Sequence, residues 1–298
     1  MSALTDLVRE ELSIRVDPRV AAMASAIAAR YPGSARAVLF YGSCLRESEL
    51  DGLMLDFYLI VSDYGDAYPK RWLAAANRLI PPNVFPFEHD GLIAKYAVLS
   101  EGDFHRLNGP ETRNVSVWAR FAQPSRLVWA VDDTGRDRAV AAVARAAPTL
   151  LAAAGAVDGE APLDWWRRAF SLTYSVELRA ERTGRAQSVV DADVARYDRF
   201  SLPAMAAIPA GAASGGWARR RIEGKLLSIV RLAKASLTYA GGIDYLAWKI
   251  NRHAGTKIEI KPWQRRWPLV AALTLVPRLV TVRAHRRSGG SPVRARST

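Results

Sequence analysis

The chain is poor in cysteine and histidine. Its 298 residues include one cysteine, Cys44, which excludes a disulfide framework and any cysteine-based metal cluster. The four histidines, at positions 89, 105, 253 and 285, show no metal-ligand spacing. Neither a disulfide-stapled fold nor a zinc-finger type of domain is therefore expected.

Long hydrophobic runs are also missing. The most apolar late stretch, Trp267 to Val282, has 16 residues and contains Pro277 and Arg278. A helix that crosses a bilayer needs about 20 largely uncharged apolar residues, so no transmembrane span is predicted. The hypothesis that this stretch lies in the membrane interface stays open. The N-terminal residues show no signal-peptide pattern, which favours a cytoplasmic protein.

Acidic residues are scarce only near the C-terminus. The whole chain has 42 Lys and Arg against 29 Asp and Glu, a net charge of +13. Residues 217–298 hold 18 of the basic and 3 of the acidic residues, a net charge of +15, which leaves −2 for residues 1–216. The protein is therefore expected to have a near-neutral body and a basic end, which argues against a uniformly basic nucleic-acid coat.

Hydrophobic periodicity predicts a mixed α/β fold. Strands are expected at 35–41, 55–61, 83–87, 92–100 and 126–131, and helices at 4–31, 69–79, 139–154, 163–183, 224–240 and 245–253. Small residues, Pro and Gly predict a linker at 201–216, and the basic tail 288–298 is expected to be disordered. We expect a mixed-sheet domain (1–140), a mainly helical domain with winged-helix topology as one candidate (141–215), and a basic helical segment (216–298).

The most informative stretch is Val38 to Val61. A hydrophobic strand ends in Gly42-Ser43, and 13 positions after Ser43 the carboxylate of Asp56 opens a second hydrophobic strand. A Gly-Ser turn lets backbone N–H groups and a hydroxyl approach a triphosphate closely, and the carboxylate can hold Mg²⁺ against the same phosphates. This layout is similar to that of nucleotidyltransferases of the polymerase-beta type. The simpler alternative, a turn followed by a strand-capping Asp, stays open.

The stretch departs from that pattern at one position. The usual motif has two acids, two positions apart, and if Asp56 is the second, the first falls on Met54. Asp51 is the tentative second metal ligand, and Glu88 and Asp90 are further candidates. Asp63 is expected to cap the turn after its strand instead.

Several short blocks resemble one family within this class, the mitochondrial-type CDP-diacylglycerol synthases (the translocator assembly and maintenance family) and their bacterial relatives. The blocks follow the family's order over residues 38–185: Tyr41-Gly42-Ser43, Met54-Leu55-Asp56-Phe57, Val61-Ser62-Asp63, 95–100, 119–124 and 172–179. The missing first acid is a feature that this chain shares with the family.

The resemblance implies a nucleotidyltransferase fold and a phosphatidate cytidylyltransferase of phospholipid biosynthesis, which transfers CMP from CTP to phosphatidic acid with Mg²⁺. The catalytic residues would be Asp56, Ser43 and Lys95, and Asp56 would bind the metal, with Asp51 as the tentative second ligand. The nucleotide-binding residues would be Tyr41, Gly42, Ser43, Lys95 and Arg120, and a tentative lipid-side set would be Tyr174, Glu177 and Arg179.

The basic end has the composition of a membrane-interface segment. Trp263, Arg265, Arg266 and Trp267 precede a short apolar run, and indole rings and basic side chains both favour the surface of an anionic bilayer. We therefore expect a peripheral protein on the inner face of a bacterial cell membrane, with no nucleic-acid partner. Two alternatives stay open: a nucleotidyltransferase with a soluble acceptor, such as an aminoglycoside or a nucleic-acid end, and a non-catalytic nucleic-acid-binding protein.

Overall fold

The structure is a computed structural model that describes residues 2–47, 49–155, 159–176, 189–212, 214–238 and 260–262. The chain divides into two compact units, Met1–Ser228 and Ile229–Thr298. The sheet and the helices around it belong to the first unit.

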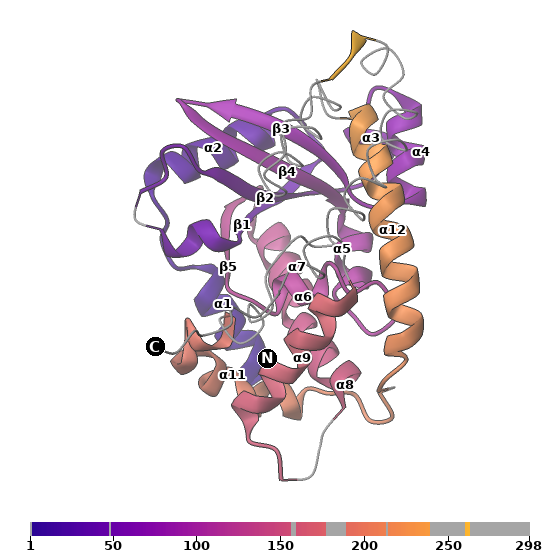
Figure 1. The fold of residues 1–298 in the computed structure, drawn as a ribbon. Helices are drawn as coiled ribbons and strands as arrows, with labels where there is room; N and C mark the ends of the chain where they lie inside the picture. Colours follow the sequence, from indigo (N-terminus) through magenta and orange to yellow (C-terminus); the bar gives the residue numbers. More distant parts are fainter. Residues whose placement is uncertain are drawn as a thin grey trace, which may run out of the picture. The chain divides into compact units, whose positions relative to one another are not determined.

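A five-stranded mixed sheet forms the centre of the first unit (Figure 1). Its strands are β1 (Ala35–Tyr41), β2 (Met54–Val61), β3 (Asn83–His89), β4 (Leu92–Ser100) and β5 (Ser125–Ala130), in the order β3-β4-β2-β1-β5. The central pair β2 and β4 is parallel, and the other neighbouring strands are antiparallel. The predicted α/β class is confirmed, and each predicted strand is present with ends that shift by at most two residues.

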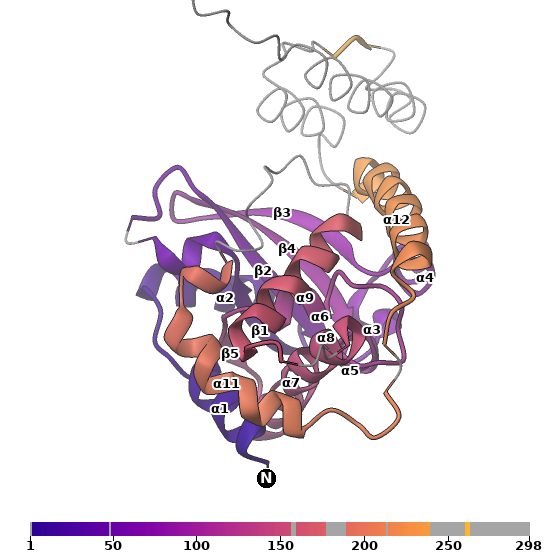
Figure 2. The same ribbon diagram turned by 60° about the horizontal axis from the view of Figure 1, so that its bottom comes forward.

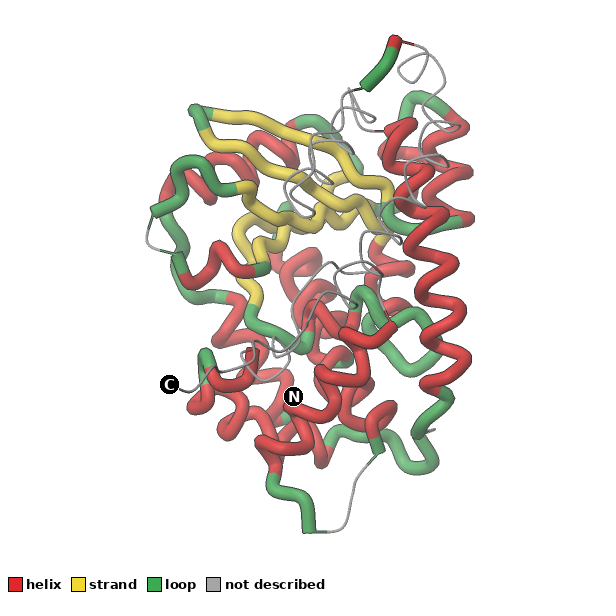
Figure 3. The backbone as a smooth tube through the Cα atoms, in the orientation of Figure 1, coloured by secondary structure: helices red, strands yellow, loops and turns green. Residues whose placement is uncertain are grey.

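Helices cover both faces of the sheet, as the tube in Figure 3 also shows. One face packs against α2 (Pro18–Ala29), α3 (Tyr64–Ala67) and α4 (Arg71–Leu79). The other packs against α1 (Ala3–Leu12), α5 (Glu101–Leu107), α6 (Trp118–Phe121), α7 (Asp133–Ala144), α8 (Ala146–Ala154), α9 (Pro162–Val176) and α11 (Val194–Ala206). A long helix, α12 (Trp217–Thr238), follows.

Alternation along β2 decides which of its side chains meet which layer. Leu55, Phe57 and Leu59 are buried in the core beneath α2. Tyr58 and Ile60 are buried on the opposite face, in the core beneath α6 and α7. Because successive strand residues point to opposite faces, Asp56 shares the face of Tyr58 and Ile60.

Two helix predictions are wrong in their extent because proline and capping residues interrupt them. The helix predicted over 4–31 is two helices, since Pro18 stands in the first turn of α2 and the Asp17 carboxylate caps that turn at the Arg19 N–H. The helix predicted over 139–154 is also two helices: α7 ends at Ala144, and Pro148 in the first turn of α8 has no N–H to continue the hydrogen-bond series. The short helix α5, which begins at the N-cap Ser100, was not predicted.

The linker predicted at 201–216 is wrong over its first six residues. Helix α11 continues to Ala206 and has Pro203 inside it. Ser201 and Ala204 are buried there, and the Ser201 hydroxyl accepts a hydrogen bond from Trp166 Nε1 at 3.0 Å. Tertiary packing therefore keeps helical a segment whose small residues are typical of a linker.

Some predictions fall outside the described residues: the helix at 245–253, the disordered tail and residues 177–183 of the predicted helix 163–183. The winged-helix topology stays a prediction. Within the part of the chain that the structure describes, no helix combines the length and the apolarity needed to cross a bilayer.

Candidate functional site

The turn after β1 brings the backbone over a carboxylate. Gly42 has φ +98° and leads directly into the 3₁₀ turn Ser43–Arg46. Glycine is favoured here by its backbone angle, which other residues rarely adopt, and a Cβ atom on residue 42 would make a tight contact of 3.3 Å with Asp56 Oδ2. The exposed Ser43 follows, and the turn therefore offers a hydroxyl and backbone groups beside the carboxylate.

Strand register places a lysine opposite that carboxylate. Asp56 is opposite Tyr41 of β1 on one side and Lys95 of β4 on the other. Lys95 Nζ lies 2.8 Å from Asp56 Oδ1, and the two side chains keep 31% and 22% of their surface exposed. The structure thus brings Tyr41, Gly42, Asp56 and Lys95 together at one place on the sheet.

The Asp56 carboxylate retains bonding capacity for a cation. Its Oδ1 atom is buried and accepts no hydrogen bond from the described groups, so Lys95 is a charge partner at that oxygen without hydrogen-bond geometry. Carboxylate oxygens are the ligands that Mg²⁺ prefers, together with substrate phosphates and water. The described residues contain no group of three or more acidic, histidine or cysteine side chains around a common point. The other oxygen, Oδ2, faces the space over Gly42, so a Mg²⁺ bound there would use this carboxylate as a ligand.

Arg120 of α6 adds a second positive charge on the same face of the sheet. Its Nη1 atom donates to Tyr58 Oη at 3.0 Å and to the Ser116 carbonyl at 3.1 Å. The guanidinium also stands 5.1 Å from the centre of the Tyr41 ring and 5.9 Å from that of Tyr58. Since Tyr41 is opposite Asp56 and Tyr58 is two positions along β2, both rings hold Arg120 next to the Asp56 site.

Tyr58 is a site residue that the sequence interpretation missed. It is two residues after Asp56 in β2, so period-2 alternation puts the two side chains on one face. The alternation was visible in the sequence. No sequence pattern indicated that Arg120, 62 residues later, would donate a hydrogen bond to the Tyr58 hydroxyl.

Cys44 has a structural role beside the turn. The thiol is buried, and its Sγ lies 3.6 Å from the Met54 carbonyl oxygen. Burial, with the negative charge of Asp56 as a further cause, raises the pKa of the Cys44 thiol. The residue therefore stays protonated and fills space.

The other candidate carboxylates have different surroundings. Asp51 pairs with Arg19 of α2 at 3.1 Å, and α2 covers the face of the sheet opposite to Asp56. Asp90 is in the turn between β3 and β4 with φ +48°, and Glu88 is exposed near the end of β3. Asp63 caps α3 by accepting from the Gly65 N–H at 2.6 Å, as expected. The structure joins none of these four to Asp56 through a described contact.

The lipid-side predictions are only partly within the described chain. Tyr174 is a half-buried residue of α9 that packs against the core. Glu177 and Arg179 lie outside the described residues, as do Trp263, Arg265, Arg266 and Trp267. Their roles stay predictions.

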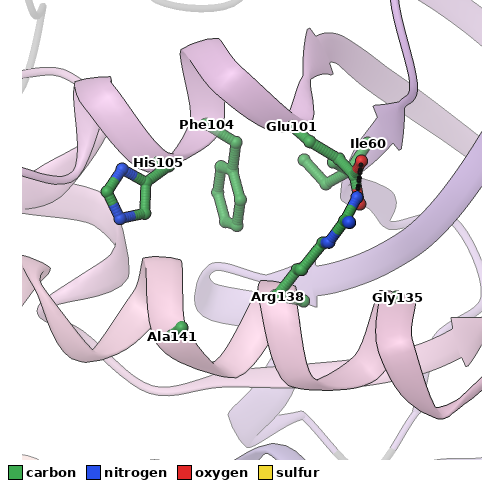
Figure 4. A pocket seen from close by; sticks show the side chains of 8 residues that line it. Ile60, Glu101, Phe104, His105, Gly135, Arg138 and Ala141 are labelled. Atoms are coloured by element: carbon green, nitrogen blue, oxygen red, sulfur yellow. Dashed lines mark hydrogen bonds and ion pairs between the residues drawn. The ribbon is translucent and has the colours of Figure 1, made fainter.

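A cavity of about 280 Å³ lies elsewhere, between α5 and α7 (Figure 4). Ile60 and Phe104 line it, and Glu101 and Arg138 form an ion pair of 2.8 Å beside it. Ile60 is four positions along β2 from Asp56, at the other half of the strand. The cavity is therefore not part of the Asp56 site.

No protein-family model matches the chain, and no curated protein matches it significantly in sequence.

Proposed function

We propose that the protein is a nucleotidyltransferase that uses Mg²⁺. The observation that carries this proposal is the Gly42-Ser43 turn against the Asp56 carboxylate, with Lys95 paired to the same carboxylate. The turn supplies a close approach for phosphates, the carboxylate supplies a metal ligand, and the lysine supplies a fixed positive charge. Together these three parts suit nucleotidyl transfer.

The resemblance of the short sequence blocks supports a definite reaction: CTP as the donor and phosphatidic acid as the acceptor. An oxygen of the lipid phosphate attacks the α-phosphorus of CTP, the bond to the β-phosphate breaks, and pyrophosphate leaves. When bound, Mg²⁺ would stabilise negative charge on the phosphate oxygens.

The protein side chains have mainly a positioning task in this reaction. A phosphate acceptor is already an anion at neutral pH, so it needs no strong general base to remove a proton. Two anions repel one another, however, and Lys95 and Arg120 offer positive charge on the face where they would meet. This charge arrangement favours an anionic acceptor over a neutral hydroxyl of a soluble acceptor.

The surface of α12 supports action at a membrane. Ile222, Leu226 and Val230 are exposed and recur every four residues, which places them along one side of the helix. Arg219, Arg221 and Lys225 are exposed beside this stripe. The first part of α12, up to Ser228, belongs to the first unit, where Trp217 Nε1 donates to the Ala153 carbonyl at 3.1 Å. An apolar stripe with basic flanks suits the interface of an anionic bilayer, on the cytoplasmic side in this proposal.

The assay that tests the reaction uses labelled CTP, Mg²⁺ and vesicles that contain phosphatidic acid. The proposal expects radiolabelled CDP-lipid and an equal amount of pyrophosphate. If the label moves instead to an added aminoglycoside or nucleic-acid end, the acceptor assignment is wrong. Salt-sensitive DNA or RNA binding without any transfer would favour the non-catalytic alternative.

Changing the apolar stripe of α12 should weaken vesicle binding. We expect Ile222→Asp with Leu226→Asp to lower the partition onto phosphatidate vesicles at least about tenfold, since burying one large aliphatic side chain is worth about 1.5–3 kcal/mol. Vesicle co-flotation measures this partition. The control is Leu202→Asp, which changes an exposed leucine on α11. Equal losses in the two proteins would contradict a specific role of α12.

A further inference from the structure

The lysine beside Asp56 also contacts Met54, the position at which a two-acid site would have its other acid. Met54 and Asp56 are two positions apart on β2 and therefore share a face, and Lys95 is opposite Asp56 on β4. The Lys95 ammonium lies 2.8 Å from Asp56 Oδ1 and 4.0 Å from Met54 Sδ. The amine thus contacts both positions at which a two-acid site would hold its metal ions.

We propose that Lys95 is a built-in cation that takes the place of one of two metal ions, so that the site binds one divalent ion with each nucleotide. This inference rests on the proposed nucleotidyl transfer. Two-metal sites hold ions about 3.5–4 Å apart between shared carboxylates. Here one carboxylate is shared between a lysine and at most one such ion.

The two oxygens of Asp56 support this division. Oδ1 contacts the Lys95 ammonium, while Oδ2 is the atom nearest to the space over Gly42. The metal that comes with a nucleotide would therefore bind on the side of the Gly42-Ser43 turn, where the phosphates are expected. Lys95 is a residue of β4, and its ammonium occupies the Oδ1 side of the carboxylate.

Charge supports the same conclusion. A second divalent ion at Oδ1 would stand next to the ammonium, and a single carboxylate supplies too little negative charge to offset both. Lysine is a compact point charge with three donors, so it can contact Asp56 and still donate to a phosphate oxygen. It would supply positive charge at that phosphate without needing ligands of its own.

The test counts bound metal instead of turnover. Purified protein is dialysed to equilibrium against Mn²⁺ and the α,β-methylene analogue of CTP, and the Mn²⁺ and nucleotide retained by the protein are both measured. We expect one Mn²⁺ per bound nucleotide in the wild type. Met54→Asp alone should still hold one ion, because Lys95 remains in place. Met54→Asp with Lys95→Ala should hold two.

Lys70→Ala is the control for loss of a surface lysine and should leave the count at one. Two ions per nucleotide in the wild type, or in Met54→Asp alone, would overturn the inference while the proposed function stands. A wild type that retains neither nucleotide nor metal would overturn the proposed function, and the inference with it. If the double variant does not fold, the wild-type and Met54→Asp counts still decide the question.

Discussion

Replacing Asp56 with Asn should lower the transfer of CMP to phosphatidic acid about 100- to 1,000-fold, the usual effect of losing one charge-stabilising group at a reacting phosphate or carbonyl. The amide retains the shape of the side chain but removes the negative charge that pairs with Lys95 at 2.8 Å. A neutral amide also cannot hold Mg²⁺ as a carboxylate does. The initial rate of CDP-lipid formation at saturating CTP measures the loss.

A second readout separates the loss of chemistry from the loss of folding. The Asp56 and Lys95 side chains keep 22% and 31% of their surface exposed and Asp56 Oδ1 is buried, so the free energy of unfolding should fall by about 1–3 kcal/mol, which leaves the protein folded. Retention of Mn²⁺ with the CTP analogue should fall in parallel with the rate. The matched control is Asp133→Asn, which changes a fully exposed aspartate of α7. If the Asp56→Asn protein keeps more than a tenth of the wild-type rate, the proposed role of Asp56 in catalysis is wrong.

The strands could be predicted because their signal is local. The run 35–41 and the run 92–100 became β1 and β4 with no change of bounds, since continuous apolar residues between turns are typical of buried strands. Helix ends were less predictable. Pro18 divides one predicted helix, where the Asp17 cap begins α2, yet Pro203 lies inside α11, where Ser201 and Ala204 pack into the core.

The sequence predicted the individual residues of the candidate site, but it did not predict which of their side chains contact one another. Gly42, Ser43 and Asp56 are close in sequence, and the turn between two strands brings them together. The contact of Asp56 with Lys95 depends on the parallel pairing of β2 with β4, which two helices and β3 separate along the chain. No local pattern specifies such a register, because it is set by which faces of the strands are buried.

A buried ion pair between distant segments stabilises the helical layer behind the site. Figure 2 shows α11 against α1, although the two helices are nearly 200 positions apart in sequence. Arg196 of α11 donates to Glu11 of α1 through Nε at 2.5 Å and through Nη2 at 3.1 Å. Its Nη1 also donates to the carbonyl of Ala122, two residues after Arg120. The pair therefore connects α1 and α11 to the segment that positions Arg120.

Glu11→Ala should reduce the free energy of unfolding by about 3–5 kcal/mol, because it leaves the Arg196 charge buried without its partner. Both side chains keep only 8% of their surface exposed, so water cannot replace the lost carboxylate. Urea unfolding followed by circular dichroism measures the change. The aromatic rings of Tyr197 and Phe200 lie 4.8 and 4.3 Å from the guanidinium carbon and cannot supply a full negative charge.

The neighbouring residue supplies a matched control for this prediction. Glu10 pairs with Arg199 between the same two helices, but at 3.3 Å and with both side chains exposed, so Glu10→Ala should cost no more than about 1 kcal/mol. Glu11→Leu with Arg196→Met should recover most of the stability, because apolar pairs often replace buried ion pairs without loss. Equal destabilisation by Glu10→Ala and Glu11→Ala would show that burial does not govern the strength of these contacts. Failure of the double variant to recover stability would show that the other contacts of Arg196, with the Ala122 carbonyl and the two aromatic rings, contribute much of the loss.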